Sequence, residues 1–129
     1  MSVIKPTGIR GARLALTLLA SVVLEPAGAV AHAFLDHAIP SVGSSVHGSP
    51  GEVKVWFTQA LEPAFSSLRV VDQNGAQVDR QNSAVDPSDR TLMKVSLPSL
   101  PPGRYRVLWR ALSVDTHTTE GNFTFEVVP

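Results

Sequence analysis

The chain has 129 residues, with 11 Lys and Arg against 11 Asp and Glu, so its formal net charge at pH 7 is zero. It has no block of basic residues, which argues against nucleic acid or an anionic membrane surface as a partner. It also has no cysteine, and this excludes zinc–thiolate, iron–sulfur and blue-copper thiolate centres.

The first 31 residues have the pattern of a secretory signal peptide. Three basic residues precede an apolar run at residues 14–24, which is too short to cross about 30 Å of hydrocarbon as a helix. Ala29-Val30-Ala31 then forms a small-x-small cleavage box. We therefore expect cleavage after Ala31 and export to the periplasm. The alternative is an uncut N-terminal membrane anchor.

Cleavage would leave residues 32–129 as one small β domain that starts with His32. This part carries eight Lys and Arg against ten Asp and Glu, a net charge of about −2 with neutral histidines. No second apolar run approaches membrane length, so a soluble mature protein is expected.

Most of residues 32–129 show the alternation of apolar and polar residues that is typical of β-strands. The predicted strands are residues 53–57, 68–71, 92–97, 104–110 and 123–127. Asn74-Gly75 predicts a hairpin turn, with residues 77–78 beginning the return. Residues 59–67 allow a helical turn, and residues 81–90 have the composition of a loop. Turn signals every eight to twelve residues predict an all-β Greek-key sandwich or barrel.

Four histidines follow the predicted signal peptide. We interpret His47 as a surface residue, because it lies in a turn-rich segment with no obvious partner. His37 would point to the opposite face of a strand from His32. An auxiliary role for His37 at a metal site is left open.

His32 and His117 are the candidate metal ligands. A chain that starts at His32 offers an α-amine and an imidazole on one residue. Asp115 and His117 are two residues apart in a polar loop between strands, so their side chains can share one metal. Three nitrogens and one oxygen suit Cu(II), which also leads the Irving–Williams order. We expect one Cu(II) per chain.

Several segments together resemble one known family. His32-Ala33 at the expected mature terminus is followed by Pro40, Gly43-Ser44, the strand at 53–57, residues 103–110 (GRYRVLWR) and Ser113-Val114-Asp115-x-His117. This combination is similar to the CopC family of periplasmic copper-resistance and copper-trafficking proteins, over nearly all of residues 32–129.

The resemblance implies a seven-stranded Greek-key β-barrel of the cupredoxin or immunoglobulin type. It also implies Cu(II) bound by His32, through amine and ring, with Asp115 and His117. An inner-membrane partner of the CopD type would receive the copper.

Two positions depart from the family pattern. Many members have Gly where this chain has Thr116, so a loop that needs positive φ there would have to be shaped differently. Only one Met follows the signal peptide, which does not favour a separate Cu(I) site.

The sequence therefore predicts a non-enzymatic Cu(II) protein for copper resistance, buffering or trafficking. A copper-dependent oxidative enzyme of the N-terminal-histidine type is one alternative. Trp56, Tyr105 and Trp109 argue against it, because they lie in strand patterns and are expected to pack rather than form a flat glycan-binding surface. The other alternative is a β-sandwich module without a metal.

Overall fold

The computed structural model describes residues 2–4, 8, 17 and 32–129. The predicted cleavage box at residues 29–31 lies outside the described residues. The described residues form eight strands and one 3₁₀ turn, in this order: β1 (Leu35–Ile39), β2 (Ser45–His47), β3 (Glu52–Phe57), η1 (Pro63–Phe65), β4 (Ser67–Val71), β5 (Ala84–Val85), β6 (Leu92–Ser96), β7 (Gly103–Leu112) and β8 (Thr118–Val128). The predicted all-β fold is confirmed.

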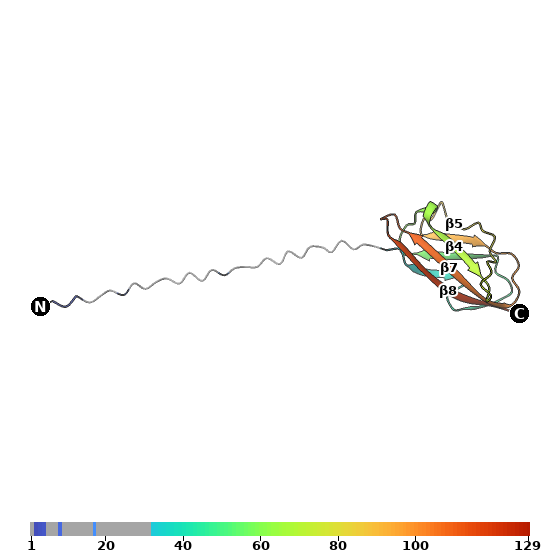
Figure 1. Cartoon of the computed structure of the whole chain (residues 1–129), viewed down its shortest axis with the longest axis horizontal. Helices are drawn as coiled ribbons and strands as arrows, with labels where there is room; N and C mark the ends of the chain where they lie inside the picture. Colours follow the sequence, from blue (N-terminus) through green and yellow to red (C-terminus); the bar gives the residue numbers. More distant parts are fainter. Residues whose placement is uncertain (1, 5–7, 9–16, 18–31) are drawn as a thin grey trace.

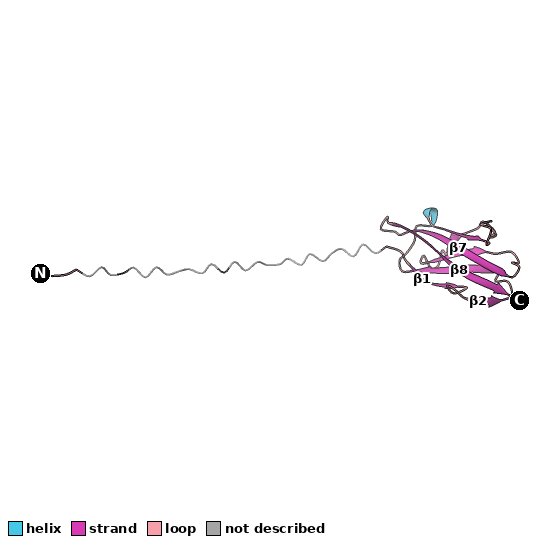
Figure 2. Cartoon of the chain, turned by 60° about the horizontal axis from the view of Figure 1, so that its bottom comes forward, coloured by secondary structure: helices cyan, strands magenta, loops and turns pink. Residues whose placement is uncertain are grey.

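The strands form two four-stranded sheets, which Figures 1 and 2 show from two sides. One sheet has the order β1-β3-β6-β5 and the other β2-β8-β7-β4. All pairs are antiparallel except β2 and β8, which run parallel. The fold is thus a sandwich with one strand more than the seven expected.

The hydrophobic core lies between the two sheets and is filled by side chains at alternating positions along the strands. In β6, Met93 and Val95 are fully buried while Lys94 between them is half-buried. In β7, Tyr105 and Val107 are buried, and Trp109 packs edge-on against Phe57 with ring centroids 5.2 Å apart. Both strands therefore show the alternation of buried and more exposed residues from which they were predicted.

Three local predictions were wrong or incomplete. The segment at residues 81–90 is not entirely loop, because Ala84 and Val85 pair with β6 as the short strand β5. His47 ends the short strand β2, beside Val128 of β8, and does not lie in an unpaired turn. The Asn74-Gly75 turn is present, but its return makes only an isolated bridge at Gln77.

The longest ladder joins β7 to β8 in unbroken register from Gly103 opposite Val127 to Leu112 opposite Thr118. The loop of residues 113–117 therefore lies at the tip of a long hairpin. In the part of the chain that the structure describes, no helix is long and apolar enough to cross a membrane.

Candidate metal centre

The tip of the β7–β8 hairpin is closed by hydrogen bonds within residues 113–117. The Ser113 amide donates to the His117 carbonyl over 3.0 Å, and the Thr116 amide donates to the Ser113 carbonyl over 2.9 Å. Ser113 is 1% exposed, so the loop is fixed at its base while Asp115 and His117 remain exposed. The structure thus places both predicted side chains at the surface on a constrained turn.

Asp115 is held in one orientation by its own loop. The Ser113 hydroxyl donates to its Oδ1, and the His117 amide lies 3.4 Å from the same oxygen. The Ser113 hydrogen bond is the main cause that lowers the pKa of Asp115 below its usual range. The carboxylate is therefore ionised at neutral pH, which is the form that binds a cation.

Thr116 keeps the positive φ that was expected to be lost without glycine. Its φ is +75°, in the left-handed region that β-branched residues rarely adopt. The lack of glycine at this position therefore does not prevent positive φ. The loop holds a threonine in a conformation that suits glycine.

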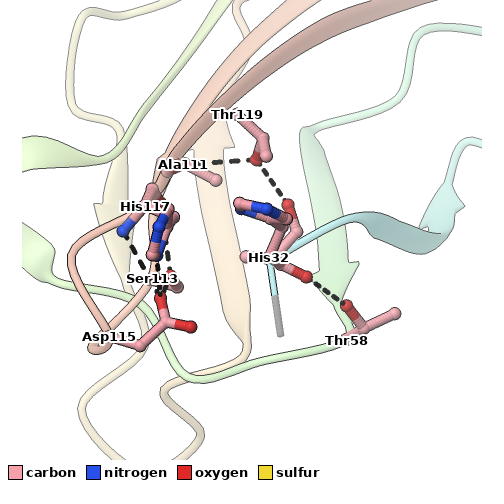
Figure 3. Close-up of polar contacts among 8 residues, drawn as sticks. His32, Thr58, Ala111, Ser113, Asp115, His117 and Thr119 are labelled. Atoms are coloured by element: carbon pink, nitrogen blue, oxygen red, sulfur yellow. Dashed lines mark hydrogen bonds and ion pairs between the residues drawn. The ribbon is translucent and has the colours of Figure 1, made fainter. Parts of the chain in front are cut away.

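Two threonines fix the segment before β1. Thr58 accepts a hydrogen bond from the Phe34 amide over 3.0 Å and donates to the His32 carbonyl over 3.3 Å. Thr119 in β8 donates to the Ala33 carbonyl, and Ala33 is fully buried. Figure 3 shows the contact between Thr58 and His32 on one side of the segment and Thr119 on the other. His32 is consequently held against the sandwich.

The structure brings His32 and His117 into contact, although they lie near opposite ends of the described domain. Their ring centroids are 4.6 Å apart and the rings are nearly perpendicular, at 89°. Nδ1 of His32 is buried and has no hydrogen-bond partner. A buried polar atom without a partner is unfavourable unless a ligand or water satisfies it.

Asp115 is the second neighbour of His117, on which His32 also packs. Its Oδ1 lies 3.5 Å from His117 Nδ1, so His117 lies between the other two predicted ligands (Figure 3). Within residues 32–129 and the few described residues before them, no group of three or more His, Cys, Asp or Glu side chains is close enough to hold a metal ion. The three residues form two adjacent pairs instead.

The other two histidines have different neighbours. His37 Nδ1 contacts Asp36 Oδ2 at 2.7 Å, and its ring stacks on Trp56 with centroids 4.4 Å apart. His47 Nδ1 lies 3.0 Å from the Pro129 carbonyl oxygen. Both rings are thus engaged by contacts that do not include His32 or His117.

Sequence reasoning missed the residues that support this site. Ser113 belongs to the motif quoted from the sequence, but its hydrogen bond to Asp115 was not predicted. No local pattern singles out Thr58 or Thr119, whose bonds to the His32 segment join residues 26 and 86 positions apart.

Comparisons with known proteins agree with this architecture. The family described as "CopC domain" matches residues 35–128. Protein YobA of Escherichia coli K12 is 31% identical over 92% of this chain and 95% of its own length. Copper resistance protein C of Pseudomonas syringae pv. tomato is 32% identical over 87% of this chain and 93% of that protein. The crystal structure of CopC from Methylosinus trichosporium OB3b covers 76% of this chain and 95% of that one, with 35% identity and a TM-score of 0.68. The resemblance seen in the sequence is thus confirmed, and the chain belongs to the CopC family.

Proposed function

We propose that this protein binds one Cu(II) ion at His32, Asp115 and His117, and buffers or carries copper in the periplasm. The observation that carries the proposal is the contact between the His32 and His117 rings, with a buried ring nitrogen of His32 left without a partner. The family membership and the copper-resistance name of a relative support the choice of metal.

The unpartnered nitrogen of His32 is the one suited to chelation. If cleavage after Ala31 frees the α-amine, a metal bound to that amine and to Nδ1 closes a six-membered ring through Cα, Cβ and Cγ. Nε2 lies on the far side of the imidazole and cannot close this ring. The orphaned Nδ1 therefore fits an amine–imidazole chelate.

Asp115 and His117 would supply the remaining donors. Two imidazoles, one amine and one carboxylate form a nitrogen–oxygen set without sulfur, which suits Cu(II) rather than Cu(I). Ser113 orients the carboxylate through its hydrogen bond, as outer groups commonly do for metal ligands. Thr58 and Thr119 would keep His32 beside the loop by holding its backbone.

Carrying copper without turnover is the role that this donor set favours. A set of four protein donors leaves little room for oxygen, which argues against the oxidative enzyme. A copper carrier needs an acceptor, and the family resemblance points to an inner-membrane protein of the CopD type. Turnover of a reductant or a polysaccharide by the copper-loaded protein would contradict this role.

The test changes the chain end and nothing else. One Gly is added before His32, so that the ring survives but its own nitrogen becomes an amide. The control carries one Gly after Pro129. Competition titration should show a loss of Cu(II) affinity of more than tenfold, which corresponds to about 1.4 kcal/mol, only for the N-terminal extension. Its electron paramagnetic resonance spectrum should shift as well.

Circular dichroism should show the same fold for the native and both extended proteins, because chain termini tolerate such changes. His117→Ala is a second variant that should weaken Cu(II) binding without unfolding, since the side chain is exposed. Equal affinities and equal spectra for the native and N-terminally extended proteins would exclude the terminal amine as a ligand.

A further inference from the structure

The outer face of the sheet β2-β8-β7-β4 carries a row of arginines. Arg104 and Arg106 are two residues apart on β7, and both are exposed. Val71 of β4 pairs with Arg106. Arg69 lies two residues before Val71 in β4 and therefore on the same face. Three cationic side chains from two neighbouring strands thus share one surface.

A hollow of about 420 Å³ lies at this row. Its lining includes all three arginines, with Asp72, Gln73 and Thr124 among the other polar residues. The carboxylate of Asp72 already takes part in the turn after β4, because its Oδ1 accepts hydrogen bonds from the amides of Asn74 and Ala76. The hollow therefore has three cations and one carboxylate that the turn uses.

These arginines lack the carboxylate partners that most other cations of the domain have. Of the eight Lys and Arg in residues 32–129, four lie within 4.0 Å of a carboxylate oxygen: Lys54, Arg90, Lys94 and Arg110. No ion pair in the described chain includes any of the other four, which are Arg69, Arg80, Arg104 and Arg106. Arg106 instead contacts the amide oxygen of Asn122 at 2.5 Å. Three of the four unpaired cations thus line one hollow.

We propose that this hollow is a docking site for an acidic, extended segment of a partner protein. Arg104 and Arg106 are about 7 Å apart along the strand, which is also the spacing of alternate side chains in an extended peptide. Carboxylates at alternating positions of such a segment can therefore each meet one guanidinium. Arginine also binds carboxylates in a two-pronged geometry that lysine cannot make.

The docking site lies at the opposite end of β7 from the candidate metal centre. Arg104 follows the first residue of β7, whereas Asp115 lies just beyond its last residue, Leu112. Arg104 and Leu112 are eight residue steps apart along the strand, or about 26 Å. A partner anchored here leaves the metal end uncovered. The proposal does not depend on copper binding.

The probe is a fluorescein-labelled, acetylated and amidated peptide of five Glu-Thr repeats, with five Gln-Thr repeats as the neutral control. Fluorescence anisotropy with the exported protein should show binding of the Glu peptide only. Binding should weaken as NaCl rises from about 0.05 to 0.5 M, since salt screens exposed charges. No binding of the Glu peptide at low salt would overturn the proposal.

Charge reversal then locates the site. Arg69→Glu, Arg104→Glu and Arg106→Glu should each weaken the Glu peptide at least threefold. Arg80→Glu is the matched control, because it makes the same charge change at the one unpaired arginine of the described chain outside the hollow, and it should change affinity less than twofold. The corresponding Arg→Gln variants repeat the test if a Glu variant unfolds. Equal losses for Arg80→Glu and the others would overturn the proposal.

Citrate distinguishes a docking site from a small-anion site. At matched ionic strength, citrate should not displace the Glu peptide more effectively than chloride does. Displacement by citrate at a concentration near that of the peptide would assign the hollow to small polycarboxylates and overturn the docking proposal.

Discussion

Replacing Thr116 with Gly should stabilise the protein, against the usual effect of introducing glycine. Thr116 is exposed and has a φ of +75°, which costs a β-branched residue about 1–2 kcal/mol. Glycine removes this strain but loses about 0.5–1 kcal/mol through the greater freedom of the unfolded chain. The net gain is about 0.5–1 kcal/mol, because the hydrogen bond from the Thr116 amide survives the change.

Thermal unfolding of the metal-free protein measures this gain. For a domain of this size, about 1 kcal/mol moves Tm by about 4–8 °C, so Tm should rise by about 2–8 °C. Gly48→Thr is the inverse control, because Gly48 has a φ of +79° and open space where a Cβ would lie, and its Tm should fall. An unchanged or lower Tm for Thr116→Gly would refute the argument from strain.

Four further results are expected. Gly121→Ala should destabilise the fold by about 1–3 kcal/mol in denaturant unfolding, because a Cβ at Gly121 would overlap the Trp109 ring. The hydrogen bond from Lys94 holds the pKa of Asp86 well below its usual range. The ionised carboxylate therefore stabilises the fold at pH values above the unfolded-state pKa of about 3.9. This stabilisation is lost as the pH falls through the lower pKa of the folded state. Asp86→Asn should therefore lower Tm at pH 7, with a smaller difference from the native protein below about pH 4. His47→Ala should leave Cu(II) affinity unchanged in a competition titration, because its ring contacts the chain end. Cu(II) affinity of the native protein should fall on acidification, since protons compete for amine and imidazole nitrogens, and an affinity independent of pH from about 4 to 7 would contradict nitrogen ligation.

The sequence predicted five of the six strands that have five or more residues, and it missed β1, β2 and β5. Alternation over five or more residues predicted β6 and β7, and the structure confirms both strands. β5 has two residues and β2 has three, too few for a period of two to stand out. β2 moreover pairs in parallel with β8 at the far end of the chain, a partner that no local pattern names.

The candidate metal centre also has residues that local sequence predicts and residues that it does not. Residue type and spacing singled out His32, Asp115 and His117, and the structure brings His117 beside each of the other two. The threonines that hold the His32 segment were not predictable, since their role arises only from tertiary proximity. Positive φ at Thr116 was also missed, because local sterics disfavour it and the surrounding hairpin imposes it.

The hydrogen bond between Thr119 and Ala33 spans 86 positions of the chain, and this has a consequence for folding kinetics. Bringing such distant residues together lowers the conformational entropy of the chain before the new contacts stabilise it. β-Sandwiches of this kind therefore fold slowly, in about milliseconds to seconds. The two halves of the candidate metal centre come together only when this long-range contact is formed. An unfolded chain therefore has no assembled site, and any ion that binds only the folded protein will raise Tm as its concentration increases.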